Sequence, residues 1–366
     1  MDWLTKQFEL SRGDGHNERA MEGLRGFAVF LVFLVHFVTL MNPWISDNSN
    51  FLVLTRSLHT VGNTGVDLFF VLSGYLIYGS LLTRPQQFLR FMARRVQRIY
   101  PAFAVVFLTY VALSFALPAE NKIPTPAFSA AIYLLQNFFL LPGMFAIDPM
   151  ITVAWSLSYE MFYYLAIPLL ILLFRMRERD AIWRTTFFLS LAILTTVYCA
   201  LYGGHVRLIM FMSGIVLVET IRSGQVSPPP GTVGVLALVV GLLSTLLPID
   251  GSIGIALKTA ILSIAFFALC LTCFHNPVSW LPRRFSWTPL RWLGNMSYSY
   301  YLLHGLALNA GFLALRFFMP ASSHGAWLFW ILLPPMFLLT LVPTAALFLL
   351  VERPYSLVQH KRSDLA

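Results

Sequence analysis

The chain has 366 residues, of which 58% are hydrophobic and only 11% are charged. A soluble domain carries about a quarter charged residues, so this composition excludes a soluble globular protein and indicates an integral membrane protein. The formal net charge of +9 does not indicate nucleic acid, because the basic residues lie in short segments between apolar stretches. We therefore expect a lipid bilayer, and no nucleic acid, among the partners.

The apolar stretches predict an all-α integral membrane protein with about ten transmembrane helices in one bundle. Residues 127–147 are apolar but contain Pro142 and Gly143, which predicts an interfacial or re-entrant segment. We expect a single domain over 1–366, with residues 1–23 before the first helix and 352–366 after the last. In chain order, the expected helices lie near 24–41, 66–82, 100–117, 152–174, 186–202, 207–221, 232–248, 255–274, 293–318 and 326–351.

The distribution of basic residues predicts the orientation of this bundle. Ten helices place both termini on one side, and 20 of the 25 Lys and Arg residues then fall on that side. Because basic residues are enriched in cytoplasmic loops, both termini are expected to be cytoplasmic.

The first expected helix contains the stretch LRGFAVFLVFLVHF, with Arg25 at its start and His36 deep in the apolar run. The two residues are 11 positions apart, which places them on one helix face and roughly 16 Å apart along the axis. A titratable imidazole inside a bilayer is costly, so His36 is a candidate functional residue. The alternative is a histidine that packs against a neighbouring helix.

Two other helices carry polar residues at similar depth. The second contains Asp67 and Ser73, although Asp67 also suits the outer membrane interface. In the fourth, Ser156, Glu160 and Tyr164 follow at i, i+4 and i+8 and therefore share one face. A carboxylate one to two turns inside the membrane indicates function or a buried ion pair.

The ninth helix adds Ser297, Tyr300 and His304, which also share a face. His304 lies about 16 Å from the cytoplasmic end of its helix, a depth comparable to that of the first-helix histidine. Two intramembrane histidines together with two carboxylates predict a polar cavity. No metal is expected, because the three cysteines lie in apolar stretches without further ligands.

The segment RFMARRVQRIYP at 90–101 places Arg94, Arg95 and Arg98 at the cytoplasmic mouth of the third helix. Arginines there can anchor the topology or contact anionic lipid. The other interpretation is a phosphate site, because the guanidinium fork matches phosphate oxygens. The sequence contains no Gly-rich phosphate loop, which argues against a coupled nucleotide hydrolase.

The chain resembles the membrane-bound acyltransferase-3 family. The resemblance rests on LRGFAVFLVFLVHF, GVDLFFVLSGYLI, RRVQRIYP, WSLSYEMFYYL, LGNMSYSYYLLH and VERP, which occur in this order over nearly the whole chain. It implies transfer of acyl groups to extracytoplasmic glycans and some small molecules, with Arg25 and His36 as the essential pair. It also implies, less directly, functional roles for Asp67, Arg95, Arg98, Trp155, Glu160 and Glu352.

This resemblance implies a membrane O-acyltransferase that uses cytoplasmic acyl-CoA, with acetyl-CoA as the expected donor substrate. The expected acceptor is a hydroxyl of an exopolysaccharide, a lipopolysaccharide or a lipid-linked precursor, at the inner (cytoplasmic) membrane of a bacterium. Arg25 and the three arginines of 90–101 are expected to hold the CoA phosphates. His36 would act as general base or be acylated itself, with Glu160 or Asp67 as an orienting group. We expect no fused SGNH-type domain.

Several alternatives stay open at this point. The enzyme hypothesis includes succinyl transfer and acylation of a lipid or an antibiotic. A transporter of another class would use the same intramembrane histidine and glutamate residues as a proton relay. Against a transporter, the sequence shows no inverted repeat. The oligomeric state, and whether a partner protein completes the transfer, are left open by the sequence.

Overall fold

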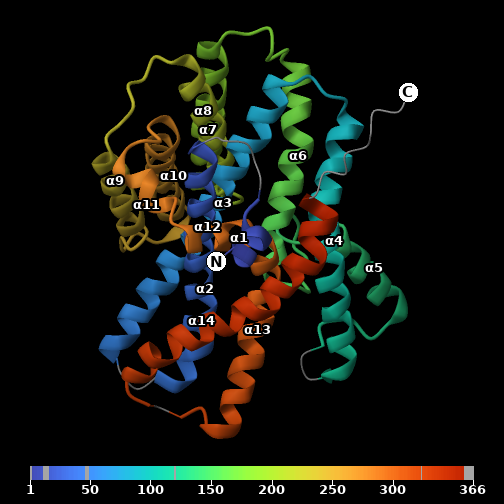
Figure 1. The fold of residues 1–366 in the computed structure, drawn as a ribbon. Coiled ribbons are helices and arrows are strands. Elements are labelled where there is room, and N and C mark those ends of the chain that lie inside the picture. The colour runs from blue at the N-terminus through green and yellow to red at the C-terminus, as the bar shows by residue number, and fades with distance from the viewer. Residues whose placement is uncertain (1, 11–15, 46–48, 119–120, 323, 358–366) are drawn as a thin grey trace.

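A computed structural model describes residues 2–10, 16–45, 49–118, 121–322 and 324–357, in which the regular elements are helices (Figure 1). A short 3-10 turn, Thr152–Ala154, precedes α6, and a π-helical segment, Phe348–Leu357, follows α14. The helices are α1 (Asp2–Phe8), α2 (His16–Ile45), α3 (Ser49–Thr83), α4 (Phe88–Ala116), α5 (Ala127–Phe138), α6 (Trp155–Leu173), α7 (Ala181–Tyr202), α8 (Leu208–Ser223), α9 (Gly231–Ser244), α10 (Gly251–His275), α11 (Trp280–Phe285), α12 (Thr288–Asn295), α13 (Ser297–Phe318) and α14 (Trp327–Leu347).

Among the described residues, eight helical segments are long and apolar enough to cross a membrane, which confirms the all-α membrane fold. They contain α2, α3, α4, α6, α7, α10, α13 and α14. The sixth and seventh expected spans correspond to α8 and α9, which have only 16 and 14 residues. The count of ten spans and the cytoplasmic placement of both termini therefore stay predictions.

Three helix boundaries differ from the expected ones. Helix α3 begins at Ser49 instead of near residue 66, and its 35 residues span about 52 Å, well beyond a bilayer core of about 30 Å. Helix α4 begins at Phe88, so the basic segment and the apolar span form one continuous helix. The ninth expected span is divided at Met296 into α12 and α13. Hydropathy missed these boundaries because it detects the lipid-embedded part of a helix, not its polar extension.

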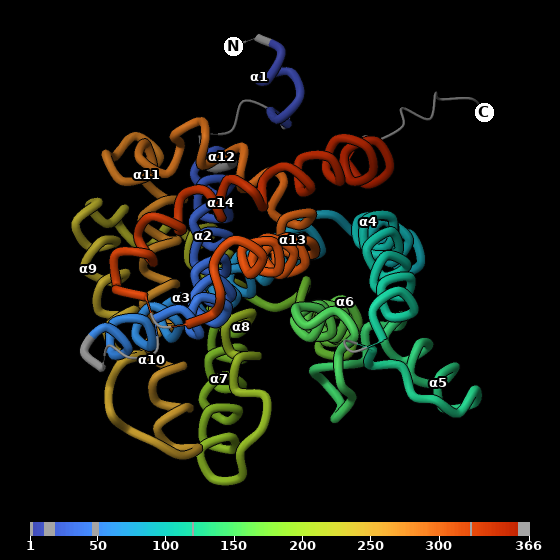
Figure 2. The backbone as a smooth tube through the Cα atoms, turned by 90° about the horizontal axis from the view of Figure 1, so that it is seen from below, coloured from blue at the N-terminus to red at the C-terminus, as the bar shows by residue number. Residues whose placement is uncertain are grey.

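Helices α2 and α3 pack against each other at the centre of the bundle (Figure 2). Helices α9, α10 and α11 lie on one side of this pair, and α4, α5 and α6 lie on the other (Figure 2). Helix α8 packs against α3, while α12 and α13 pack against α2. The central pair is thus in contact with helices from all parts of the chain.

A buried ion-pair network fixes the start of α2 against α12. Arg291 of α12 donates from Nε to Glu22 Oε2 of α2 at 2.9 Å, and it also pairs with Glu9. Arg291 and Glu22 are both buried. Glu22 lies three residues before Arg25 on α2, so this network also fixes the part of α2 that carries Arg25.

The crossing of α3 and α8 is a direct backbone contact. A Cβ atom at Gly74 of α3 would lie 2.2 Å from the carbonyl oxygen of Phe211 in α8. A Cβ atom at Gly214 of α8 would lie 2.0 Å from the carbonyl oxygen of Val71 in α3. Small residues allow membrane helices to approach this closely, so any larger side chain has to separate the pair.

We predict that Gly74→Ala lowers the free energy of unfolding by about 1–3 kcal/mol, because the added methyl group overlaps a backbone carbonyl. Gly79→Ala on the same helix is the matched control, because its Cβ would meet nothing closer than 3.5 Å. Thermal unfolding of both variants in detergent measures the difference. Equal unfolding temperatures would show that the crossing is not close-packed.

Candidate functional site

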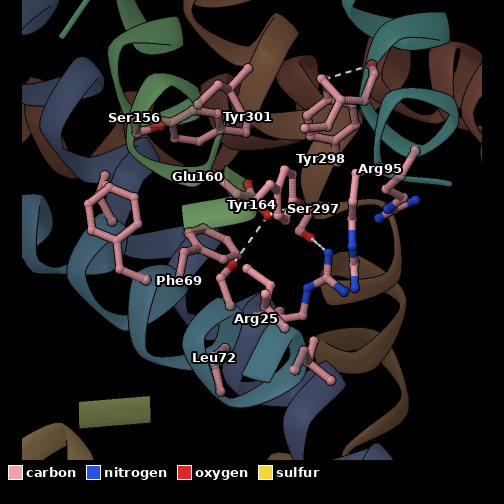
Figure 3. A pocket seen from close by; sticks show the side chains of 18 of the residues that line it. Arg25, Phe69, Leu72, Arg95, Ser156, Glu160, Tyr164, Ser297, Tyr298 and Tyr301 are labelled. Atoms are coloured by element: carbon pink, nitrogen blue, oxygen red, sulfur yellow. Dashed lines mark hydrogen bonds between the residues drawn. The ribbon is translucent and has the colours of Figure 1, made fainter. Parts of the chain in front are cut away.

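A cavity of about 410 Å³ lies between α2, α3, α4, α6 and α13, with Leu357 of the π-helical segment also contributing (Figure 3). Its polar lining comes from five helices, of which three are consecutive in the chain (α2, α3 and α4) and two lie further on (α6 and α13). Eight of the residues singled out in the sequence line it: Arg25, Ser73, Arg95, Arg98, Ser156, Glu160, Tyr164 and Ser297. The structure therefore brings together some, but not all, of the polar residues that the sequence analysis identified in the first, second, fourth and ninth expected spans and in the basic segment before the third.

Arg25 enters this cavity from α2 and is held by the first residue of α13. Its Nη2 donates to Ser297 Oγ at 2.8 Å (Figure 3). The side chain of Ser297 is buried, whereas Arg25 is half-buried. The guanidinium group is therefore oriented by a fixed partner while it still lines the cavity.

Glu160 is the carboxylate of this cavity. Its Oε1 accepts a hydrogen bond from the Tyr164 hydroxyl at 2.5 Å, one turn further along α6. The Ser73 hydroxyl of α3 donates to the same oxygen at 3.5 Å (Figure 3). These contacts join α6 to α3 and aim the carboxylate into the polar part of the cavity.

Arg95 and Arg98 of α4 have different surroundings. The Arg95 guanidinium lies over the rings of Phe91 and Tyr164, 5.0 and 5.2 Å from their centroids, and its Nε has no hydrogen-bond partner within the described ranges. Arg98 is paired with Glu352 at 2.8 Å. Of these two arginines, Arg98 is thus committed to an ion pair, whereas Arg95 lies against aromatic rings.

A second cavity of about 900 Å³ adjoins the first at the end of the bundle where α3 ends and α4 begins. Arg95, Leu76 and Ser80 line both cavities. Among the arginines of the second cavity, only Arg94 and Arg95 were identified from the sequence. The others could not be identified from the sequence, because each resembled an ordinary loop charge: Arg84, Arg90 and Arg222.

His36 lies on α2 outside the residues that line these two cavities. It is half-buried, and its ring meets the ring of buried His304 edge to face, with 4.8 Å between the centroids. Tyr301 of α13 lies between the histidines and the first cavity, because its ring is 6.1 Å from that of His304 and its hydroxyl accepts from Ser156 at 2.7 Å. His304 therefore lies next to the Tyr301 side of the cavity wall, and His36 contacts His304.

Asp67 and Trp155 lie elsewhere. Asp67 is buried and forms an ion pair with Arg207 at 3.5 Å, and Arg207 also lies over the Trp155 ring at 5.4 Å. Six residues separate Asp67 from Ser73, which turns the two side chains about 120° apart on α3. Trp155 is turned about 100° from Ser156 for the same reason. Neither residue lines the cavity that the sequence assigned to them.

Tyr300 and Glu352 were also expected at the cavity, and both are buried outside it. The Tyr300 hydroxyl shares a hydrogen bond with Thr340 Oγ1 of α14 at 2.8 Å. Glu352 forms an ion pair with Arg98 and accepts hydrogen bonds from the backbone nitrogen and the hydroxyl of Ser299. On α13 the cavity is lined instead by Tyr298 and Tyr301, which the sequence analysis missed because a run of tyrosines does not show which one faces inward.

The comparison with family models assigns the chain to a known family. A model described as an acyltransferase domain matches residues 18–349. The chain belongs to this acyltransferase family. The membership favours the enzyme hypothesis over the transporter alternative.

The chain is similar to several curated proteins. It is 28% identical over 325 residues to the peptidoglycan O-acetyltransferase OatA of Listeria monocytogenes, which covers 78% of this chain and 48% of the relative. It is 34% identical over 187 residues to the O-acetyltransferase OatA of Staphylococcus aureus, with 47% of this chain and 28% of the relative covered. An uncharacterized protein of Haemophilus influenzae is 28% identical over 231 residues, with 59% and 90% covered. The chain thus spans about half or less of the two acetyltransferases. No solved structure matches it.

We predict that Glu352→Gln destabilises the protein by about 2 kcal/mol, because it leaves the Arg98 charge without its counter-charge. Removing one partner of a fully buried pair costs about 3–5 kcal/mol, and the 21% exposure of the Arg98 side chain lowers this cost. Glu178→Gln, at an exposed position, is the control. Unfolding temperatures in detergent measure both, and an unchanged value for Glu352→Gln would contradict the pairing.

Proposed function

We propose that this chain is a membrane O-acyltransferase that moves an acetyl group from cytoplasmic acetyl-CoA to a hydroxyl of an extracytoplasmic surface glycan. The observation that carries the proposal is a continuous series of polar positions. Two cavities share Arg95, the first of them is lined by Glu160 and Arg25, and the ring of His304, which contacts His36, lies next to the Tyr301 ring of that cavity's wall. The names of the relatives, which are O-acetyltransferases, support acetyl as the group and a cell-wall glycan as the acceptor.

The second cavity suits the nucleotide end of the donor. CoA carries a 3′-phosphate and a diphosphate, and arginine forks bind phosphate oxygens in a bidentate manner. No carboxylate is among the described residues that line this cavity, so its positive charge is not neutralised locally. The arginines that would bind these phosphates are Arg84, Arg90, Arg94, Arg95 and Arg222.

The first cavity suits the acyl-pantetheine arm. Its volume of about 410 Å³ is enough for a thin chain, and much of its wall is apolar, including Phe69, Leu72 and Leu157. A flexible amide-containing arm would place its carbonyls near the guanidinium of Arg25, which lines only this cavity. The thioester would then lie towards Tyr301, on the side of the histidine pair.

His36 is the group to which we assign the chemistry. The acceptor hydroxyl gives its proton to His36 while its oxygen forms a bond to the acyl carbon. The carbon–sulfur bond then breaks, and the imidazolium returns the proton to the leaving thiolate. In the alternative order of steps, the imidazole of His36 is acylated first. This order gives ping-pong kinetics, which initial-rate measurements distinguish from direct transfer.

The positions of the second-cavity arginines and of His36 also predict the membrane face from which each substrate enters. The arginines of the second cavity belong to the side to which the positive-inside rule assigns the cytoplasm. His36 lies 11 residues beyond Arg25, or roughly 16 Å towards the opposite face. The donor would therefore enter from the cytoplasm and the glycan from outside.

We predict that His36→Gln, which keeps a polar side chain of similar length, lowers transfer by about 10²–10⁴-fold, the usual contribution of a general base. Release of CoA and labelling of peptidoglycan fragments by radioactive acetyl-CoA measure the loss. His275→Gln is the control, because that ring lies at the end of α10 and forms a hydrogen bond with the carbonyl oxygen of Val226. Retention of more than about a tenth of the activity by His36→Gln would refute the assignment.

We predict that Arg95→Ala raises the apparent KM for acetyl-CoA by about tenfold or more, the equivalent of one charge-assisted hydrogen bond, and leaves the KM for the glycan unchanged. Arg316→Ala is the matched control, because that guanidinium lies over Trp44 near the far end of α13. Initial rates at varied donor and acceptor concentrations separate the two constants. An unchanged donor KM in Arg95→Ala would leave this arginine with a topological role only.

A further inference from the structure

The geometry around His304 points to a role for this residue that rests on the proposed function of His36. We propose that His304 is the positioning residue of His36, with its bare Nε2 accepting a hydrogen bond from one ring N–H of His36. The second ring nitrogen of His36 then carries the lone pair that takes the proton of the acceptor hydroxyl. The observations that lead to this proposal concern the tautomer, the support and the surroundings of the His304 ring.

The tautomer of His304 is set by its backbone contact. Nδ1 of His304 lies 2.9 Å from the carbonyl oxygen of Tyr300. A carbonyl oxygen only accepts hydrogen bonds, so Nδ1 must carry the proton. A buried imidazole without a counter-charge is neutral, because desolvation penalises the charged form. A neutral ring has one N–H, so Nε2 of His304 is a hydrogen-bond acceptor.

This acceptor is buried and without a partner. His304 is 0% exposed, and Nε2 has no hydrogen-bond partner within the described part of the chain. A buried polar atom without a partner is unfavourable by about 1–3 kcal/mol and is uncommon in native proteins. The ring of His36, 4.8 Å away between centroids, brings two nitrogen atoms to this location. The proposed bond requires the ring of His36 to turn one N–H towards this atom.

The ring of His304 is held in place by its own support. It stacks on the ring of Tyr300, with 5.2 Å between centroids and 9° between planes. The Tyr300 hydroxyl is in turn bonded to Thr340 Oγ1 of α14 at 2.8 Å. A residue that orients another must itself be fixed, and this arrangement fixes His304 from two helices.

The carboxylates that the sequence suggested as orienting groups are engaged elsewhere. Asp67 is paired with Arg207, and Glu160 accepts from Tyr164 and Ser73. A carboxylate next to an imidazole orients it in hydrolytic triads, but the described residues place an imidazole, not a carboxylate, against the ring of His36. His304 thus occupies the place of the third group.

In this step His36 alone takes up and releases the transferred proton. His36 keeps the N–H that is bonded to His304 throughout the reaction. Its other nitrogen gains the proton from the acceptor hydroxyl and returns it to the thiolate of CoA. His304 contributes its lone pair and its fixed tautomer and exchanges no proton.

Substitution of His304 by Leu and by Gln separates positioning from packing. Leu fills the space without an acceptor, whereas Gln brings an amide oxygen near the former position of Nε2. We expect His304→Leu to lower kcat for acetyl transfer by roughly 10–100-fold with an unchanged KM for acetyl-CoA, and His304→Gln to recover most of that loss. Wild-type kcat in a folded His304→Leu protein, or equal losses in both variants, would overturn the proposal.

A measurement on the wild-type protein covers the case in which these variants do not fold. The nitrogen-15 NMR signals of labelled histidine, assigned to His36 by their loss in His36→Gln, report which ring nitrogen is protonated. His59 of α3 is a titratable group that acts electrostatically on His36, so spectra are recorded at several pH values. We expect one tautomer of His36 while it is neutral. A mixture of both tautomers would overturn the proposal.

An inactive His36→Gln together with a fully active His304→Leu would refute the positioning role and leave the proposed function intact.

Discussion

The contact between α2 and α13 is the constraint on which the site depends. Arg25 of α2 donates a hydrogen bond to Ser297, the first residue of α13. The ring of His36 of α2 contacts the ring of His304, which lies about two turns after Ser297 on α13. Because the same two helices make both contacts, the separation of the guanidinium and the imidazole is set by helix backbones rather than by loops. A displacement of α13 along α2 would break both contacts at once.

The cost of charge in an apolar bundle explains where the remaining polar residues lie. Asp67 is neutralised by Arg207 and Glu352 by Arg98, so neither carboxylate is left as an isolated charge in an apolar surrounding. Arg95 differs from them, because its guanidinium lies over two aromatic rings and its Nε has no hydrogen-bond partner among the residues that the structure describes. A charge kept in this state is available to a phosphate group without first breaking an ion pair.

Much of the fold and part of the site could be predicted from the sequence, and the limit has a physical cause. Composition alone indicated a helical membrane protein, and the 100° turn per residue placed Ser156, Glu160 and Tyr164 on one face, where the structure finds all three at the cavity. Periodicity gives the faces of a helix but not the helix that each face meets. For that reason Asp67 was assigned to the cavity. For the same reason the sequence predicted only that His304 and His36 lie at a similar depth in the membrane, not that their rings are in contact. The second cavity was missed because its arginines come from three separate segments.

The central claim is that donor and acceptor reach His36 from opposite faces of the membrane. Vesicles with the protein in one known orientation test it most directly, with radioactive acetyl-CoA on one face and peptidoglycan fragments on the other. We expect transfer only when acetyl-CoA is on the face that carries the arginines of the second cavity and the glycan is on the opposite face. Equal transfer with the two substrates exchanged, or transfer only when both are on the same face, would contradict it.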